Sequence, residues 1–145
     1  MGVRQALFGR KAYFDANVFI YLMEGFAGLE KNLLGIRDSI LHGEAEIFTS
    51  ELTICEVLML PFRDNKAALV AKYRQFIEGS GAFTLLPTTR ETYIRASLAR
   101  AQHGLKTPDA IHLASAIESG CAVFVSNDRK IKVPKGIEIL YLGDD

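Results

Sequence analysis

The sequence predicts an α/β fold in which helices cover both faces of a central parallel sheet, giving a three-layer α/β/α sandwich. Two observations predict this class. Short apolar runs typical of buried strands alternate along the chain with amphipathic runs typical of helices. Of the 145 residues, 49% are hydrophobic and 23% are charged, a balance typical of a globular domain with its own core. Because no repeat, low-complexity tract or long linker interrupts the chain, we expect a single domain over residues 1–145.

Five segments are expected to form the strands of the sheet. Each is a short apolar run, and most contain β-branched or aromatic residues. The expected strands are 12–16 (AYFDA), 46–50 (EIFTS), 82–87 (AFTLLP), 121–127 (CAVFVSN) and 137–142 (IEILYL). The fourth is apolar without interruption over most of its length, which indicates a strand buried on both faces of the sheet.

Helices are expected between these strands, from the spacing of apolar residues and from residues that begin or end helices. They cover 29–42, 51–60, 64–78, 90–103 and 108–119. Thr49 or Ser50 is expected to cap the second of these helices, and Pro61 to end or kink it. Thr89 is expected to cap the fourth helix and Thr107 the fifth. Strands that alternate with helices in this way form right-handed βαβ units, so the sheet should be parallel.

The charge and hydropathy of the chain argue against several classes of protein. The 17 Lys and Arg residues balance the 17 Asp and Glu residues, unlike a protein that coats nucleic acid without specificity. No apolar stretch approaches the roughly 20 residues that a membrane span needs, and no signal-peptide core is recognisable. We therefore expect a cytoplasmic protein that does not contact a membrane. Cys55 and Cys121 lie in apolar runs and are expected to be buried and reduced.

One carboxylate, that of Asp15, lies in surroundings that look dry. It falls within AYFDANVFIYL (12–22), where nearly all other residues are apolar and the first strand should continue into a buried helix or loop. Burying an ionised carboxylate is costly unless another group pairs with it or it coordinates a cation. The position therefore indicates a specific partner for Asp15.

Three further acids are expected at the same edge of the sheet as Asp15. Asp128 follows the fourth strand, and Asp109 lies in the first turn of the last helix. Glu56 lies in a helix that starts from the carboxyl end of the second strand. Taken singly, these three could be a turn residue, a first-turn helix acid and a solvent-facing helix residue. Ligands of parallel sheets gather at the carboxyl ends of the strands, so the joint pattern predicts a site.

Four carboxylates that lie close together repel one another, and a hard divalent cation is the usual remedy. Mg²⁺ or Mn²⁺ would suit a set of oxygen ligands, and no His/Cys cluster typical of zinc is present. Such an acid-only site is typical of phosphodiester hydrolysis, in which the metal activates water, so no histidine base is required. His112 lies one helical turn beyond Asp109 and could face the site or pack beside the core.

Four stretches in this order resemble a PIN domain. They are YFDANVFIYL (13–22), TSELTICEVL (49–58), TPDAIHLASAI (107–117) and FVSNDRKI (124–131). More narrowly, they resemble the VapC toxins of prokaryotic toxin–antitoxin pairs. The resemblance implies an α/β/α sandwich around a parallel sheet and a Mg²⁺- or Mn²⁺-dependent endoribonuclease.

The resemblance also assigns roles to the four acids. Asp15, Glu56, Asp109 and Asp128 match the catalytic acidic quartet of the family. We expect Asp15 and Asp109 to ligate the principal metal, and Asp128 to complete the site directly or through water. Glu56 would bind a second metal or orient the attacking water.

Three polar residues match positions beside those acids. Ser126 and Asn127 match the polar pair before the last acid, and Asn17 matches the polar position two residues after the first. Ser126 and Asn17 are expected to hold Asp15 in place, since metal ligands generally need such support. A lead of about ten residues before the first strand is less typical of the family, and could be a flexible end or an added contact.

The substrate that the resemblance implies is RNA, such as a tRNA or ribosomal RNA cut in an accessible single-stranded loop. Residues 90–135 contain eight Lys or Arg and four Asp or Glu, an excess that fits either phosphate contacts or solvated helix faces. The candidate RNA contacts, chosen because they flank Asp109 or Asp128 in sequence, are Arg129, Lys130, Arg95, Arg100 and Lys106.

A toxin that cuts RNA needs a restraint, and the resemblance implies a small VapB-type antitoxin that binds the toxin. DNA would then be contacted only indirectly, through the antitoxin. The helices at 29–42 and 51–60 carry more apolar residues than one buried stripe needs, which is compatible with a partner groove or with simple core packing. A homodimer is expected from the resemblance alone.

Three other functions remain open. The first is a PIN-type nuclease in RNA processing that has no antitoxin. The second is a non-catalytic Mg²⁺-binding regulatory module, whose pocket would not require an acid at Glu56. The third is a phosphatase with an aspartate nucleophile, but Asn17 replaces the second acid which that chemistry needs.

Overall fold

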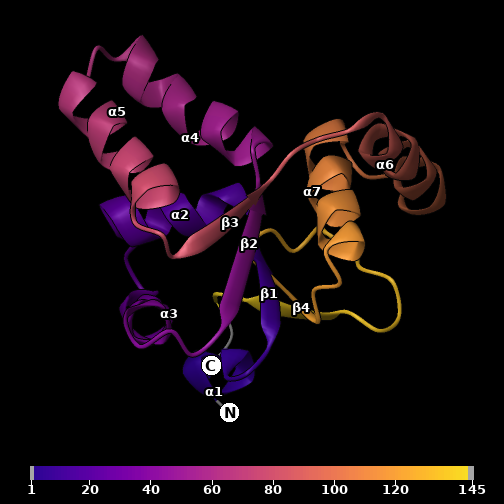
Figure 1. Ribbon diagram of the computed structural model, residues 1–145, viewed down its shortest axis with the longest axis horizontal. Helices are drawn as coiled ribbons and strands as arrows, with labels where there is room; N and C mark the ends of the chain where they lie inside the picture. Colours follow the sequence, from indigo (N-terminus) through magenta and orange to yellow (C-terminus); the bar gives the residue numbers. More distant parts are fainter. Residues whose placement is uncertain (1, 144–145) are drawn as a thin grey trace.

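A five-stranded parallel sheet forms the centre of the computed structural model, which describes residues 2–143. The strands follow the order β3-β2-β1-β4-β5, with β1 in the middle (Figure 1). They are β1 (Lys11–Phe14), β2 (Glu46–Ser50), β3 (Phe83–Leu86), β4 (Val123–Ser126) and β5 (Glu138–Tyr141). All five match strands expected from the sequence. The parallel pairing confirms the predicted sheet.

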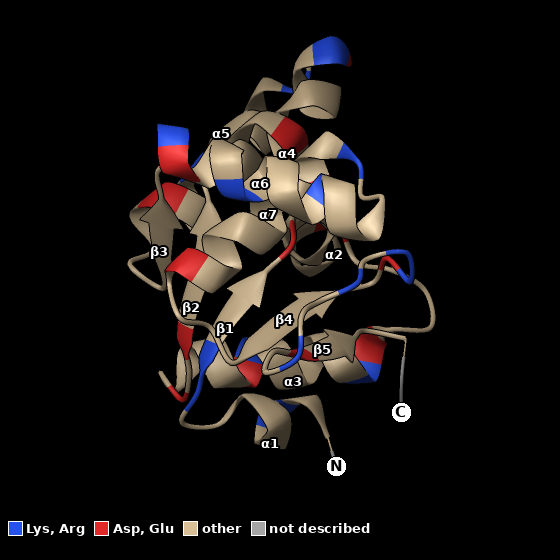
Figure 2. Ribbon diagram, turned by 90° about the vertical axis from the view of Figure 1, so that its right-hand side faces the viewer, with Lys and Arg blue, Asp and Glu red and all other residues tan. Residues whose placement is uncertain are grey.

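Helices cover both faces of the sheet, which confirms the three-layer arrangement (Figure 1). They are α1 (Val3–Leu7), α2 (Ala16–Glu24), α3 (Glu30–Leu41), α4 (Leu52–Arg63), α5 (Ala67–Arg74), α6 (Arg90–His103) and α7 (Thr107–Glu118). A π-helical turn, η1 (Gln75–Gly79), continues α5. The helices α6 and α7 pack against each other on the face that is turned to the viewer in Figure 2. None of the helices within residues 2–143 is both long and apolar enough to cross a bilayer.

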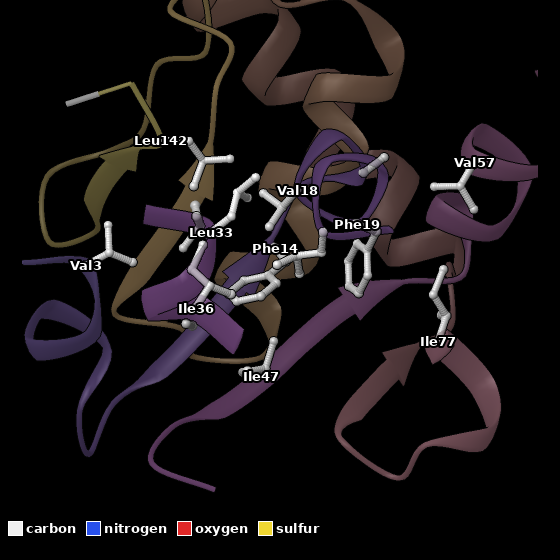
Figure 3. Packing of buried hydrophobic residues seen from close by; sticks show 14 of the residues in the cluster. Val3, Phe14, Val18, Phe19, Leu33, Ile36, Ile47, Val57, Ile77 and Leu142 are labelled. Carbon is white, nitrogen blue, oxygen red and sulfur yellow. The ribbon is translucent and has the colours of Figure 1, made fainter. Parts of the chain in front are cut away.

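The core is divided by the sheet, because successive side chains of a strand point to opposite faces. Phe14 of β1 lies near the middle of the larger cluster, which includes residues of α2, α3 and α4 (Figure 3). Its neighbour Tyr13 points to the other face, where its ring stacks on that of Phe124. All three are fully buried. Full burial of such a side chain contributes about 1.5–3 kcal/mol to stability. Burial on both faces explains why the central strands are so apolar.

The residues that cap the N-termini of three helices can be compared with those expected from the sequence. Thr89 caps α6 through a reciprocal pair of bonds with Thr92, as expected. At α4 the N-cap residue is Glu51, so the expected cap by Thr49 or Ser50 is wrong, although the hydroxyl of Ser50 accepts the Leu52 N–H at 3.0 Å. Thr107 does not cap α7, because the Ala110 N–H donates to the Lys106 carbonyl and the helix therefore begins one residue earlier than predicted.

Two further local expectations were wrong in part. Pro61 does not end α4, which continues to Arg63, because its ring fixes a φ that the helix also uses; a kink was the other expectation for this residue. Cys121 is buried as expected, but Cys55 is exposed. The helical period of α4 places Cys55 on the same outward side as Met59 and Phe62, which are also exposed.

The lead before β1 forms an added contact. It contains α1, whose Val3, Ala6 and Leu7 are buried and which packs against α3. The Arg4 guanidinium binds the Glu44 carboxylate through two hydrogen bonds of 2.7 Å. The expected alternative of a flexible end is therefore wrong for residues 3–7.

Candidate active site

Asp15 lies between β1 and α2, with 5% of its surface exposed. Its Oδ1 accepts the Ala16 N–H at 2.8 Å, so the carboxylate caps α2. Its Oδ2 accepts the Ser126 hydroxyl at 2.8 Å and the Asn17 amide at 3.2 Å. Burial raises the pKa of Asp15, and the nearby His112, the Ser126 hydroxyl and the Ala16 N–H partly oppose that rise. The partners of this buried carboxylate thus come from α2 and β4.

Asp109 and Asp128 border a cavity beside Asp15. The cavity measures about 170 Å³ and is lined by Gly104, Leu105, Lys106, Asp109, Asp128 and Lys130. Acidic and basic segments follow the carboxyl end of β4 (Figure 2). Burial raises the pKa of Asp109, and the negative charges of Asp15 and Asp128 raise it further. Asp128 is oriented by its own loop: its Oδ1 accepts the Lys130 N–H at 2.9 Å.

Glu56 reaches the same site from α4. Its side chain is 32% exposed, and its Oε1 lies 2.5 Å from Nε2 of His112. The Glu56 charge is also among the causes that raise the pKa of Asp15 and of Asp109. Asp109 therefore interacts electrostatically with each of the other three predicted acids, and Asp15 also with Glu56.

His112 is the site residue whose place the acidic pattern left undecided. It is fully buried on α7 and lies between Glu56 and Tyr13, whose hydroxyl is 2.6 Å from Nδ1. Its Nε2 is also 3.6 Å from Oδ1 of Asp15. Burial alone would lower the pKa of His112, but the hydrogen bond to Glu56 and the charges of Asp15, Glu56 and Asp109 outweigh it and raise the pKa.

The spacing of residues along the chain gave a partial indication that His112 lies at the site. His112 follows Asp109 by three residues on one helix, so both lie on the same face of α7. Tyr13 lies in β1, and Asp15 comes directly after Phe14, the last residue of that strand. Neither spacing alone identifies a pair that is separated by 99 residues in the chain.

The polar residues beside the acids form a small network. Asn17 donates to Asp15 and, at 3.4 Å, to the Ser126 hydroxyl. Its Oδ1 accepts the backbone N–H of Asn127 at 3.3 Å. The Asp128 N–H donates to the Ser126 hydroxyl at 3.0 Å. Ser126 and Asn17 contact Asp15 as expected, whereas Asn127 takes part through its backbone.

The candidate RNA contacts divide into two groups. Lys106 and Lys130 line the cavity with Asp109 and Asp128. The three arginines do not line it. Arg100 donates to the Leu105 carbonyl at 3.3 Å, Arg129 stacks on the Tyr141 ring at 4.3 Å, and Arg95 is exposed on α6.

The carboxylates offer oxygen donors to a divalent cation, but they are not gathered into a closed cage. Within residues 2–143, no three His, Cys, Asp or Glu side chains are arranged so that they could hold one metal ion together. Mg²⁺, however, usually keeps several waters and binds through one or two carboxylates. The hard oxygen donors, and the repulsion that raises the pKa of Asp109, fit a cation held in that way.

Comparison with known proteins places the chain in context. A family model described as the PIN domain matches residues 12–136, a range that includes all four acids. No curated protein sequence matches the chain.

Several solved structures have a similar fold. A toxin–antitoxin complex from Klebsiella pneumoniae has a TM-score of 0.67 and 21% identity, over 90% of this chain and 97% of that chain. VapBC2 from Rickettsia felis, bound to a promoter DNA fragment, has a TM-score of 0.69 and 12% identity, over 90% and 98%. VapC20 from Mycobacterium tuberculosis, described as a sarcin–ricin loop cleaving toxin, has a TM-score of 0.61 and 14% identity, over 78% and 86%. At these identities the likeness is one of fold.

Proposed function

The chain belongs to the PIN-domain family, and on that premise we propose that it is a Mg²⁺- or Mn²⁺-dependent endoribonuclease. The observation that carries the proposal is the convergence of Asp15, Glu56, Asp109 and Asp128 at the carboxyl ends of β1 and β4. Carboxylates that raise one another's pKa gain most from a bound cation. An acidic site of this kind, bordered by lysines, suits a phosphodiester substrate.

In this proposal Asp15 and Asp109 would hold the cation, and Asp128 would complete the site directly or through water. A bound Mg²⁺ or Mn²⁺ would supply positive charge that lowers the pKa of water and stabilises the phosphate oxygens as the bond breaks. Ser126 and the Ala16 N–H fix the rotation of the Asp15 carboxylate. Glu56 would accept a hydrogen bond from the attacking water and orient it toward the phosphorus, or would bind a second cation.

We propose that RNA lies across the cavity with a phosphate near Lys106 and Lys130. Ammonium groups beside the carboxylates would offset the repulsion between those acids and the phosphates. Arg95, Arg100 and Arg129 lie outside the cavity and would contact the RNA farther from the cut. A structured RNA with an accessible loop suits such a site, because bases splayed from loops can be reached by a protein.

A VapB-type antitoxin is the proposed partner, and DNA would be bound only through it. The support is an apolar groove of about 420 Å³ between α2, α3 and η1, lined by Leu22, Met23, Arg37, Asp38, Ile40, Leu41 and Phe76. The groove includes part of the α3 segment that the sequence marked as too apolar for a single buried stripe. Grooves of this kind accept an amphipathic helix.

A homodimer is proposed as the form of the free protein. Exposed apolar side chains on α4 and α6 would be covered by a second copy. They are Met59, Leu60, Phe62, Tyr93, Ile94 and Leu98.

The test is cleavage of total cellular RNA by purified protein with Mn²⁺, with EDTA, and after Asp15→Asn or Asp109→Asn. We expect discrete fragments that disappear with EDTA and with either substitution. Activity that survives both substitutions would refute the site. A folded wild-type protein that cuts no RNA would favour the non-catalytic Mg²⁺-binding module. A cleaving protein that binds no antitoxin would favour RNA processing.

A further inference from the structure

His112 is a buried histidine at the site to which the acidic quartet assigns no role. Its side chain is 1% exposed, so the ring cannot touch an RNA bound in the open cavity. Any part that it takes in the reaction must act through a neighbour. The neighbours that hydrogen-bond its two ring nitrogens are Tyr13 and Glu56.

The Tyr13 side of the ring is anchored in the sheet. The Tyr13 hydroxyl accepts the backbone N–H of Ser50 at 3.0 Å, which ties β1 to the end of β2. The same hydroxyl lies 2.6 Å from Nδ1 of His112, and the two form a hydrogen bond whichever of them carries the proton. The Tyr13 ring stacks on Phe124 at 5.3 Å and meets the His112 ring edge-on at 5.7 Å. His112 is therefore held on a rigid support.

On its other side, the His112 ring forms a hydrogen bond from Nε2 to the Glu56 carboxylate. An ionised carboxylate can only accept, so the contact between Nε2 and Oε1 requires the proton on Nε2. Within residues 2–143 this is the only hydrogen bond of the Glu56 side chain. Glu56 is partly exposed and is repelled by Asp15 and Asp109, whose pKa its charge raises. Without His112, the flexible side chain would turn toward solvent.

We propose that His112 is a positioning residue. Tyr13, itself bound by the Ser50 N–H, fixes the His112 ring, and the ring in turn fixes the position of the Glu56 carboxylate. The proposal rests on the nuclease function above, and it identifies the residue that keeps Glu56 aimed at the other acids. Tyr13, His112 and Glu56 form a single hydrogen-bonded chain from the interior of the sheet to the site. Residues that orient a metal site in this way typically change its activity about 10–100-fold when they are replaced.

The kinetic test is a double-mutant cycle on a single-stranded RNA oligonucleotide with saturating Mn²⁺. We expect His112→Leu to lower kcat about 10–100-fold and to change KM less than about twofold. In a Glu56→Gln background the same substitution should change kcat less than about threefold, because the carboxylate that it positions is gone. His112→Gln, whose amide N–H can still donate to Glu56, should restore part of the loss, and it serves as the second variant if His112→Leu does not fold.

Ser115→Ala is the matched control. Ser115 is as deeply buried on the same helix, and its hydroxyl has no hydrogen-bond partner within the described residues. We expect its kcat to stay within about twofold of the wild type. An equal loss in Ser115→Ala would assign the effect to the packing of α7 and overturn the positioning role.

A second readout does not depend on activity. In proton NMR spectra of the metal-free protein, we expect a slowly exchanging His112 Nε2–H signal that moves in Glu56→Gln. A missing signal, or one that Glu56→Gln leaves unchanged, would overturn the proposal.

Wild-type protein that cuts no RNA would refute the nuclease function and this role together. Equal kcat losses for His112→Leu in both backgrounds would refute the positioning role alone.

Discussion

Asp15 and Asp109 lie at the same edge of the sheet in opposite kinds of surroundings. Asp15 is almost fully buried, and both its oxygens accept hydrogen bonds. Asp109 is partly exposed at the cavity, and its carboxylate has no hydrogen-bond partner within residues 2–143. The fold therefore fixes one half of the site, at Asp15, and leaves the other half, at Asp109, open to a ligand. Fixed groups lower the cost of reorganisation, whereas open groups admit cation and substrate.

The largest expected effect comes from removing the charge at the fixed half. Asp15→Asn keeps the size of the side chain but removes its attraction for a cation, which is worth several kcal/mol, so kcat/KM should fall on the order of 10³-fold. Because burial makes the ionised Asp15 costly, Tm should stay the same or rise. Kinetics and thermal denaturation of the variant check both expectations.

Asp64→Asn, a change at an exposed aspartate that follows α4, is the control and should leave both values unchanged. If Asp15→Asn lost its activity only because Tm dropped by tens of degrees, Asp15 would be a structural residue and the contrast with Asp109 would fail.

A smaller effect is expected when the fixed half is loosened but its charge is kept. Ser126→Ala removes the hydroxyl that donates to Asp15 and accepts the Asp128 N–H. The affinity for Mn²⁺ should fall about 10–100-fold, as for other residues that orient metal ligands. Calorimetry on Ser126→Ala checks this, with Ser97→Ala on α6 as the control. Equal affinities in the two variants would show that the carboxylate needs no such support.

The pH dependence of stability provides a third comparison. Asp15, Asp109 and His112 each have a raised pKa in the folded protein, so the folded state binds these protons more tightly than the unfolded chain does. The stability that they contribute is present below their unfolded pKa values and is lost as pH rises through the folded ones. Glu44 and Glu78 have a lowered pKa because each binds an arginine, so the stability that they contribute is present above their unfolded pKa values and is lost only as the pH falls.

We therefore expect the Tm of the metal-free protein to fall between about pH 5 and pH 8. The rise in Tm on adding Mn²⁺ should grow over the same range, because the cation replaces protons. Thermal scans at several pH values measure both trends, and Asp109→Asn should flatten them. A Tm of the metal-free protein that rises with pH would contradict the sign.

The smallest effect is expected at the rim of the open half. Lys106→Ala and Lys130→Ala should each raise KM a few-fold and leave kcat nearly unchanged. Each should also reduce the slope of log affinity against log salt by about 0.7, the value for one phosphate contact with a single strand. Lys72→Ala, on the exposed side of α5, should change neither quantity. RNA binding measured at several salt concentrations tests this, and an equal change for Lys72→Ala would argue against a local phosphate site.

Much of the fold and of the acidic quartet could be predicted from the sequence. Period-two and helical spacing locate the elements, and in a parallel sheet the carboxyl ends of strands share one edge. Asp15 and Asp128 could therefore be expected at the same edge of the sheet, because each lies at the carboxyl end of an expected strand. Ser126 precedes Asp128 at the end of a buried strand, and its contact with Asp15 follows from the neighbouring positions of β1 and β4.

Contacts between long side chains from different elements could not be predicted from the sequence. The contact from Tyr13 through His112 to Glu56 joins three elements that periodicity describes separately. The directions of Arg100 and Arg129 depend on a local carbonyl and a local ring rather than on the nearby acids. These outcomes follow from packing and hydrogen-bond geometry, which residue spacing does not specify.

Calorimetric titration of metal-free protein with Mn²⁺ tests the central claim most directly. The account predicts saturable binding in the wild type, no measurable binding in Asp15→Asn or Asp109→Asn, and unchanged binding in Asp64→Asn. Wild-type binding that persists unaltered in both Asp15→Asn and Asp109→Asn, or a folded wild type that binds no Mn²⁺ at all, would contradict it.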